Sequence, residues 1–526
     1  MPNPSIPRPG AKAGRARPGA PELGGPKPGA PKTSKEAIRR YEPDIIEAVR
    51  RLVRIRSVKG DAAPGAPFGE GCLAALGEAL AMGEELGLAT KNVDGYAGHI
   101  EIGAGDEIVG VLNHLDVVPE GSGWDEDIPP YEAVHKDGCI FGRGTSDNKG
   151  AAAVSMYCLK AIRDMGVPLK RRVRLILGTD EESGWEDMRH YLSREALPDL
   201  GFSPDAGYPI CNREKGILNL RFDAQPFGGG ANGADDENGA NGAAAAPAAP
   251  LSPIISIDGG IARNSTPDAC HAVVDLSLAG FSRAAFLERI GALGGEVVSR
   301  DGDTVRIFRA GRPAHGAAPQ SGDNAVAHML EILEPLYWDG DDARSRFLRF
   351  ARQKIAYETD GASLGMKAED EPSGPLTVNM GIFALGADSA SLHLDIRYPV
   401  THTREAVEAA AREIAGAYGL AVSAEAFKAP LYVSPDSALI AALSRAYERV
   451  TGAKAELYSM GGGTYARVLR NNGVAFGPGG LPGGSSLPEE KRRKGGAHAA
   501  NEYCVVEDLM RHAEVCIEAI IELANC

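Results

Sequence analysis

The residues of this chain best suited to chemistry are acids and histidines that occur in short clusters. Four such clusters each follow an apolar run of the sequence: HLD (114–116), SDNKG (146–150), TDEE (179–182) and SPDAGYP (203–209). Taken singly, each has an ordinary structural explanation. His114 and Asp116 could form a structural pair, the adjacent acids 181–182 could lie in a solvated turn, and Asp147 could cap a helix. The combination of the clusters is more informative than any one of them.

Together the clusters fit the requirements of a hydrolase that uses two divalent cations. Such a site needs one carboxylate between two ions about 3.5–4 Å apart, and another carboxylate that acts as the general base. The other ligands are His nitrogens and terminal carboxylates, which are the usual ligands of catalytic zinc. Adjacent residues at a strand end point in different directions, so Glu181 and Glu182 can divide the roles of base and ligand.

The apolar runs before these clusters predict the elements that position them. EIVGVLN (107–113) and RRVRLILG (171–178) are typical of buried strands, and helical patterns cover 34–58, 71–87 and 149–166. Alternating strands and helices predict an α/β fold with a mostly parallel sheet flanked by helices. Ligand groups gather at the carboxyl ends of such strands, where the polar clusters lie.

The pattern changes in the middle of the chain, where alternating runs such as 217–225 and 391–400 predict half-exposed strands, with a helix over 282–294 between others. We therefore expect an α+β domain inserted into the first one. Low-complexity composition predicts a disordered loop in this domain and a second flexible insert over 483–496. The predicted organisation is a disordered tail (1–35), a catalytic domain in two parts (36–215 and 428–526), and an inserted lid domain (216–427) with its disordered loop (228–250).

Composition narrows the possible partners. The net charge is −15, from 56 basic and 71 acidic side chains, which argues against a nucleic-acid or anionic-membrane surface. No apolar run is long enough for a transmembrane helix. The basic, Pro- and Gly-rich start lacks the apolar stretch of a secretory signal, and a targeting peptide is the alternative to a disordered tail. The eight cysteines form no Cys-x-x-Cys pair, so a zinc finger is disfavoured and reduced thiols in a cytoplasm fit best.

The ordered motifs HLDVVP, GRGTSDNKG, TDEESGW, SPDAGYP and, near the end, GPGG with AHAANEY resemble the zinc aminoacylase/carnosinase family of metallopeptidases. SPDAGYPI, GRPAHGAAPQSG and MGGGTYAR resemble its bacterial dipeptidase V (PepV-like) branch. The resemblance extends from about residue 36 to the end, apart from the two inserts. The loop of the inserted domain has no counterpart in the family pattern, and the insert 483–496 stands just before His498 and could shift that residue. It implies a two-zinc peptidase that hydrolyses the single peptide bond of dipeptides with a free amino end.

The resemblance also implies a role for each clustered residue. One zinc ion would be held by His114, Asp147 and Asp205, and the other by Asp147, Glu182 and His498, so that Asp147 bridges the two. Asp116 would orient His114, and Glu181 would take a proton from the metal-bridging water and pass it to the leaving amine. A cis peptide bond is implied directly after Asp147. Zinc is the favoured metal, with manganese and cobalt as alternatives.

The lid residues follow from the same resemblance. His315 would stabilise the oxyanion of the tetrahedral intermediate. Asn264 and Arg397 would bind substrate, although Arg397 could instead form a salt bridge on a strand face. The amides of Gly462, Gly463 and Thr464, in the loop that begins at Gly461, could hold a terminal carboxylate, and a tight turn is the alternative.

Three alternatives remain open from the sequence. An amidohydrolase of the same family that acts on N-acyl amino acids would use the same metals and base. A non-catalytic metal- or peptide-binding relative would be expected to lack the base, yet Glu181 is present. A nucleic-acid or scaffold protein is disfavoured by the acidic composition. The long lid favours a monomer, because it could supply its own histidine, and a homodimer is the alternative.

Overall fold

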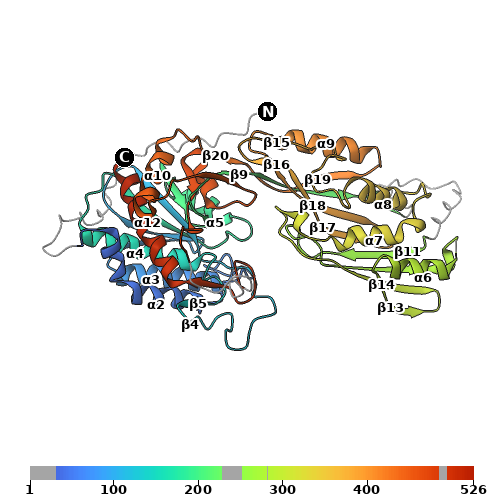
Figure 1. Cartoon of the computed structure of the whole chain (residues 1–526), viewed down its shortest axis with the longest axis horizontal. Helices are drawn as coiled ribbons and strands as arrows, with labels where there is room; N and C mark the ends of the chain where they lie inside the picture. Colours follow the sequence, from blue (N-terminus) through green and yellow to red (C-terminus); the bar gives the residue numbers. More distant parts are fainter. Residues whose placement is uncertain (1–30, 228–251, 281, 485–494) are drawn as a thin grey trace, which may run out of the picture. The chain divides into compact units, whose positions relative to one another are not determined.

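The computed structural model describes residues 31–227, 252–280, 282–484 and 495–526 (Figure 1). The predicted disordered tail up to residue 30, the predicted loop 228–250 and most of the predicted insert 483–496 lie outside the described residues. Among the helices of the described ranges, none combines the length and the apolar character that crossing a bilayer requires.

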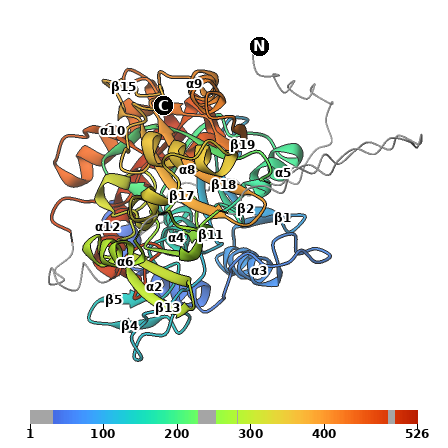
Figure 2. The same cartoon turned by 90° about the vertical axis from the view of Figure 1, so that its right-hand side faces the viewer.

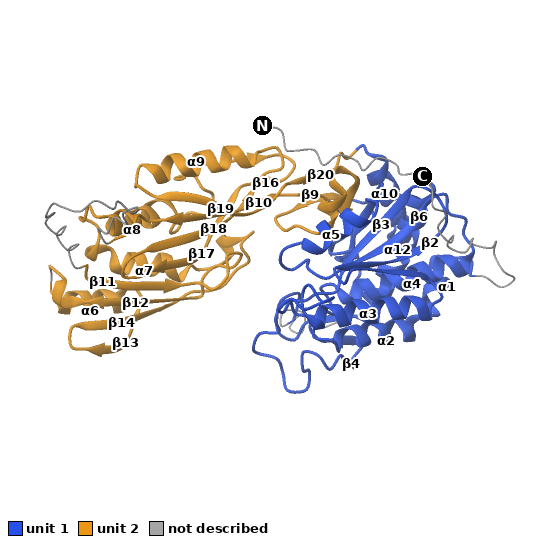
Figure 3. Ribbon diagram, turned by 180° about the vertical axis from the view of Figure 1, so that it is seen from behind, with its two compact units in different colours: residues 1–210, 436–455, 475–526 blue, residues 211–435, 456–474 orange. Residues whose placement is uncertain are grey.

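The chain divides into two compact units (Figure 3). Unit 1 comprises 1–210, 436–455 and 475–526, and unit 2 comprises 211–435 and 456–474. The predicted domain boundaries therefore differ from the observed ones by several residues, and the segment 456–474 belongs to unit 2. One reason is that this segment pairs with unit 2 residues: the Lys215 amide donates to the carbonyl oxygen of Met460, and the Arg467 side chain is paired with Glu214.

Unit 1 is an α/β domain in which five strands lie side by side in one sheet, in the order β1-β2-β6-β3-β7. The three inner strands β6, β3 and β7 are parallel, whereas β1 and β2 add at one edge in antiparallel orientation. All seven residues of β3 are buried, as expected for a strand covered on both faces. The strands are β1 (Ala89–Val93), β2 (Ala97–Ile102), β3 (Ile108–His114), β6 (Arg172–Gly178) and β7 (Leu200–Ser203).

Helices of unit 1 pack against this sheet. The long helices α4 and α12 contact each other and also β3 and β6 (Figure 1, α12 in red), while α3 contacts β1 and β2. α4 ends at Gly166 in the left-handed conformation that favours glycine. The helices are α1 (Ser34–Arg39), α2 (Glu42–Val53), α3 (Glu70–Glu85), α4 (Lys149–Met165), α5 (Glu186–Arg194), α10 (Ala438–Thr451) and α12 (Val506–Asn525).

The predicted single helix over 34–58 is wrong, because α1 and α2 are separate. Pro43 lies in the first turn of α2, and it lacks the amide that a continuous helix would need there. α1 begins inside the predicted tail, because the Thr33 side chain caps it by accepting a hydrogen bond from the amide of Glu36.

Two small sheets of unit 1 bring distant segments together. β24 pairs with β5, and β5 with β4, both antiparallel; β23 pairs with β8 in parallel. The strands are β4 (Val134–Lys136), β5 (Cys139–Phe141), β8 (Ala206–Gly207), β23 (Pro478–Gly479) and β24 (Tyr503–Val505). The β5–β24 pairing places the segment before Asp147 beside the segment after His498.

Unit 2 contains an eight-stranded sheet in the order β13-β14-β12-β11-β17-β18-β10-β19. Every pair of neighbouring strands in this sheet is antiparallel. Along β10, buried and half-buried residues alternate strictly, as predicted for a half-exposed strand. The strands are β10 (Gly216–Asp223), β11 (Ile254–Gly259), β12 (Ala269–Asp275), β13 (Glu296–Asp301), β14 (Thr304–Ala310), β17 (Thr377–Leu385), β18 (Ala390–Tyr398) and β19 (Ala421–Lys428).

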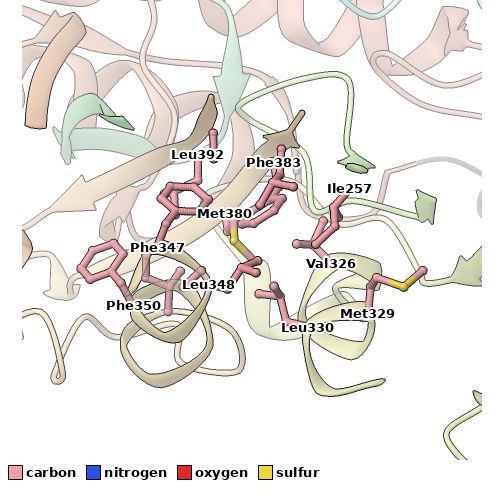
Figure 4. Close-up of a cluster of buried hydrophobic side chains, with 14 of the residues drawn as sticks. Ile257, Val326, Met329, Leu330, Phe347, Leu348, Phe350, Met380, Phe383 and Leu392 are labelled. Carbon is pink, nitrogen blue, oxygen red and sulfur yellow. The ribbon is translucent and has the colours of Figure 1, made fainter. Parts of the chain in front are cut away.

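The core of unit 2 lies between this sheet and helices. Figures 1 and 2 both show α8 (yellow) alongside β17 and β18, and the Phe347 ring of α8 packs 5.4 Å from that of Phe383 in β17. Figure 4 shows α7 and α8 side chains, among them Val326 and Leu348, facing strand residues such as Leu392. The helices are α6 (Arg283–Ala292), α7 (Ala325–Leu333), α8 (Ala343–Lys354) and α9 (Arg404–Gly416).

Candidate metal centre

The carboxyl ends of the three parallel strands of unit 1 carry the predicted ligands. β3 ends at His114, β6 is followed by the acids 181–182, and β7 is followed by Asp205. Because parallel strands end at the same edge of a sheet, these side chains converge there. Asp147 joins them from the turn before α4, and the Asp147–Asn148 peptide bond is cis, which confirms that prediction.

The convergent side chains form two groups that share one residue. His114, Asp147 and Asp205 form the first group, and Asp147, Glu182 and His498 form the second, with the possible ligand atoms of each group within 4.8 Å of one another. One Asp147 carboxylate oxygen lies 2.9 Å from His114 Nε2, and the other lies 3.1 Å from His498 Nε2. The structure therefore brings together all five predicted ligands, with Asp147 between the two histidines.

The chemistry of the donors fits divalent metal ions. Each group offers one imidazole nitrogen and two carboxylates, which is a common ligand set for catalytic zinc and is also accepted by related ions. Asp147, Glu182 and Asp205 together can carry three negative charges in a largely buried place, and cations would offset their mutual repulsion. Three protein ligands in each group also leave room for further ligands at either ion.

The neighbouring carboxylates raise the pKa values of both histidines. Hydrogen bonds to Asp147 and Glu182 raise the pKa of His498 to about 10. Burial lowers the pKa of His114, but hydrogen bonds to Asp116 and neighbouring carboxylates outweigh burial and raise that pKa well above its ordinary value.

The carboxylates are shifted in opposite directions. Burial, and then the charge of Asp147, raise the pKa of Asp205 to about 6. Burial also raises the pKa of Glu182. Burial also tends to raise the pKa of Asp147, but its hydrogen bonds to His114 and His498 outweigh burial and lower that pKa. Asp147 is therefore the member of the cluster most firmly held as a carboxylate, as a shared ligand should be.

Asp116 connects the ligand His114 to the predicted base. His114 Nδ1 lies 3.0 Å from the backbone carbonyl oxygen of Asp116 and 3.5 Å from its carboxylate Oδ1. The two carboxylate oxygens of Asp116 accept the backbone amides of Glu181 and Glu182, at 3.1 and 3.0 Å. The Trp185 indole N–H donates to the Glu181 carbonyl oxygen at 2.7 Å. Asp116 thus holds the turn that presents the base and a ligand, a role that the sequence did not suggest.

Asn148 is a further residue of the centre that the sequence analysis missed. Its side-chain amide donates to Asp205 Oδ1 at 3.1 Å and to the Pro204 carbonyl oxygen at 2.7 Å. Its own carbonyl oxygen accepts from the Asn113 side chain at 2.5 Å. Asn148 lies inside the motif that supplied Asp147, but nothing in the sequence reveals its contact with Asp205, 57 residues later.

The remaining predicted residues all belong to unit 2. The amide of Gly316, next to His315, donates to the Asn264 carbonyl oxygen at 2.7 Å. A Cβ at Gly316 would lie 2.6 Å from an Asp395 carboxylate oxygen, so only glycine permits this close approach. His315 and Asn264 are both exposed. Within unit 2 the structure therefore places His315, Asn264 and the end of β18 side by side.

Arg397 is already bonded within unit 2. Its guanidinium donates to both carboxylate oxygens of Asp395, at 2.8 and 2.6 Å, and to the Gly461 carbonyl oxygen at 2.8 Å. The alternative of a salt bridge on the strand face is therefore realised, and it also anchors the glycine loop. Substrate binding by Arg397 would have to use its remaining hydrogen-bonding capacity or exchange one of these contacts.

Thr464 is also already hydrogen-bonded within unit 2. Its backbone amide and its hydroxyl both donate to the buried Glu214 carboxylate, at 3.2 and 2.8 Å. The Arg467 guanidinium donates to the same carboxylate and to the Gly462 carbonyl oxygen, at 2.6 and 2.9 Å. These contacts make Thr464 an anchor of the loop, so the amides of Gly462 and Gly463 are the better candidates for contacting a ligand.

Comparison with known proteins places this geometry in a family. The model of peptidase family M20/M25/M40 matches residues 110–522. "Putative dipeptidase YtjP" of Bacillus subtilis (strain 168) is 38% identical over 498 residues, which cover 93% of this chain and 99% of that protein. "Putative dipeptidase SH1171" of Staphylococcus haemolyticus (strain JCSC1435) is 32% identical over 496 residues, with 93% and 99% covered.

Two solved structures show the same fold. Dug1p, a di-peptidase from Saccharomyces cerevisiae, has a TM-score of 0.54 at 12% identity, with 93% of this chain and 98% of that chain covered. Human carnosine dipeptidase 1 has a TM-score of 0.52 at 15% identity, with 93% and 99% covered. The extent of the family match, together with relatives that are similar over almost their whole length, shows that the chain belongs to peptidase family M20/M25/M40 and is a hydrolase.

Proposed function

We propose that this peptidase is a dipeptidase with two metal ions, and that it hydrolyses the peptide bond of dipeptides with a free amino end. The observation that carries the proposal is the position of Asp147, whose two carboxylate oxygens each face a different histidine. The names of the similar bacterial proteins favour dipeptides as the substrate class. Small peptides are thus the expected partners.

His114, Asp147 and Asp205 would hold one ion, and Asp147, Glu182 and His498 the other. Bound zinc, or manganese or cobalt in its place, would supply Lewis acidity that polarises the scissile carbonyl and acidifies the attacking water. Glu181, which belongs to neither group, would accept a proton from that water and deliver it to the leaving amine. Glu181 is only 9% exposed, which suits a base that must exchange protons with one water molecule.

Residues of unit 2 would bind the substrate. An imidazole N–H of His315 would donate to the oxyanion of the tetrahedral intermediate. Asn264, Arg397 and the amides of Gly462 and Gly463 would hold the substrate backbone and its terminal carboxylate, with Thr464 as the anchor of that loop. A cytoplasmic location and a monomeric state complete the proposal, and the free thiol form of all eight cysteines is consistent with a reducing compartment.

Hydrolysis assays with a substrate panel test the proposal. The full chain would be loaded with Zn²⁺, Mn²⁺ or Co²⁺ in turn and assayed with dipeptides, tripeptides and N-acetylated amino acids. We expect cleavage of dipeptides and much weaker cleavage of the other two classes. Cleavage of N-acetylated amino acids alone would make the chain an amidohydrolase. Two bound ions without cleavage of any substrate would favour a metal- or peptide-binding relative.

A further inference from the structure

A buried ion pair contacts the backbone beside two ligands of the candidate metal centre. An Arg143 guanidinium nitrogen lies 2.6 Å from Glu502 Oε2, and the two side chains are 2% and 0% exposed. Neither residue belongs to the ligand groups, to Asp116 or to the proposed base. An ion pair this deeply buried is weak evidence for stability alone, because desolvation offsets much of the Coulombic attraction. Its other contacts indicate what it positions.

The second oxygen of Glu502 binds the backbone beside the shared ligand. Glu502 Oε1 accepts the amide of Ser146 at 2.8 Å and the amide of Asp147 at 3.1 Å. Hydrogen bonds from backbone amides to a carboxylate are charge-assisted and therefore stronger than those between neutral groups. Glu502 thus fixes the peptide plane from which the Asp147 carboxylate projects toward both histidines.

Arg143 binds the segment that carries the other histidine. Its guanidinium donates to the Ala499 carbonyl oxygen at 3.2 Å, one residue after His498, and to the Glu120 carbonyl oxygen at 3.2 Å. The Glu502 carbonyl oxygen in turn accepts the Gly142 amide at 2.8 Å. One ion pair therefore links the segment of Asp147 to the segment of His498.

The segment of His498 needs such support because its backbone is strained. His498 has φ of +65° and Asn501 has φ of +58°, in the left-handed region that is uncommon for residues other than glycine, although Asn and His adopt it more often than most. A segment with two such residues would relax if its surroundings did not hold it. Glu502, immediately after Asn501, is buried where it can hold the segment in this conformation.

We propose that Glu502, together with Arg143, is a positioning residue of the metal centre, which sets the separation of Asp147 and His498. The inference rests on one part of the proposed function, the binding of two metal ions, and does not depend on the substrate. Glu502 touches neither substrate nor the proposed ions, and acts through the backbone of Ser146 and Asp147. Loss of its charge would let the two ligand segments move apart and would weaken the group that contains Asp147, Glu182 and His498.

A second buried ion pair of unit 1 provides a matched control. Glu195 and Arg174 are each 2% exposed and lie 3.4 Å apart. The pair also contacts the side chains of Lys91, Glu101 and Tyr191, on β1, β2 and α5, and none of these three is a candidate ligand. Glu195→Gln therefore disturbs a buried charge in the same unit without touching the segments of Asp147 or His498.

The test is Co²⁺ titration of the full-length apo-protein, followed by visible absorption, for the parent and for Glu502→Gln and Glu195→Gln. The visible absorption bands of bound Co²⁺ report the geometry of its ligands, and measuring them does not depend on catalysis. We expect Glu502→Gln to bind Co²⁺ about 10–100-fold more weakly, the usual range for residues that orient ligands, with altered bands. Glu195→Gln should show the affinity and bands of the parent, even where its melting temperature falls.

Three results would overturn the inference. The first is Co²⁺ affinity and absorption bands in Glu502→Gln that match those of the parent. The second is an equal loss of Co²⁺ affinity in both variants. The third is a parent that binds no Co²⁺, a result that would also remove the proposed metal centre. A parent that binds Co²⁺ but cleaves no dipeptide removes the proposed substrate and leaves this inference standing. If Glu502→Gln fails to fold, Arg143→Lys takes its place, since it keeps the buried charge but shortens the reach to Ala499; parent-like Co²⁺ binding there would also overturn the inference.

Discussion

Units 1 and 2 each bury a glutamate–arginine pair beneath a loop that carries candidate site residues. In unit 1 the pair is Glu502 with Arg143, and in unit 2 it is Glu214 with Arg467, whose side chains are 0% and 6% exposed. In both pairs the glutamate accepts backbone amides of the loop, and the arginine donates to loop carbonyl oxygens.

The two loops differ in what they present. The loops of unit 1 present charged side chains and imidazoles, which gather into one cluster suited to cations. The glycine loop of unit 2 presents neutral backbone groups, since the donors of Thr464 are already bonded to Glu214. Under the proposed function, the pair in unit 1 would support metal binding, and the pair in unit 2 would support binding of the substrate backbone and its terminal carboxylate. Substitutions in the two units should separate metal content from substrate affinity.

The largest effect is expected from removal of the shared ligand of unit 1. Residues that only orient ligands cost 10–100-fold, so Asp147→Asn should reduce kcat/KM by more than about 10³-fold and leave fewer than two ions per chain. Metal analysis after gel filtration and dipeptide assays would measure both. The exposed Asp127, in a surface pair with Lys136, supplies Asp127→Asn as a neutral control. Full metal content and activity in Asp147→Asn would contradict a shared site.

The next largest effect is expected in unit 2. His315→Ala should lower kcat by about 10²–10³-fold, the cost of losing one oxyanion donor, and should leave the metal content unchanged. Steady-state kinetics on a dipeptide would be compared with those of His402→Ala, a histidine of the same unit whose ring lies beside the Thr401 hydroxyl. A loss confined to KM would assign His315 to substrate binding instead of to the transition state.

Glu214→Gln tests the contrast between the two buried pairs. It removes the charge that anchors Thr464 and Arg467, so the glycine loop should lose its fixed geometry. We expect KM to rise about 10-fold, which corresponds to about 1.4 kcal/mol, with parent-like Co²⁺ binding. Loss of Co²⁺ similar to that of Glu502→Gln would show that the two pairs do not have separate roles.

The smallest effect concerns His512, a fully buried histidine of unit 1. Its Nδ1 lies 2.8 Å from the Tyr208 hydroxyl, and burial lowers the pKa of His512 to about 3. Its pKa in the unfolded chain is about 6.5, so the unfolded state binds more protons between these two values. The contribution of the neutral His512 ring to the free energy of unfolding is therefore fully present above pH 6.5, and it declines as the pH falls toward 3.

At pH 5 this decline amounts to about 2 kcal/mol, from about 1.4 kcal/mol per pH unit. His512→Gln cannot titrate, so its stability should fall less between pH 7.5 and pH 5 than that of the parent. Guanidinium unfolding at the two pH values would measure the difference. An equal fall in both proteins would mean that His512 does not contribute to acid sensitivity.

Much of the centre could be predicted because its ligands are local features of the sequence. His114, Glu182 and Asp205 each follow an apolar run, and such runs mark the carboxyl ends of parallel strands. The roles of those ligands, however, came from the resemblance to a family and not from spacing. The α/β class and the inserted α+β domain followed from the change from buried runs to alternating ones.

The supporting contacts could not be predicted in this way. Glu502 and Arg143 both lie inside recognised motifs, but they are 359 positions apart and no local pattern shows that they pair. Glu214 and Arg467, 253 positions apart, likewise determine that the segment 456–474 belongs to unit 2. The break between α1 and α2 was missed for a different reason, since the apolar periodicity continues across Pro43 although the backbone hydrogen bonds cannot.

The most direct test of the central claim is the activity and metal content of Glu181→Gln in the zinc-loaded full chain. Glu181 is the proposed base and not a ligand, so its loss should lower kcat on dipeptides by about 10²–10⁴-fold while two ions remain bound. That result would support a two-metal peptidase in which a carboxylate outside the ligand groups moves the proton. Activity close to that of the parent, or loss of the ions, would contradict it.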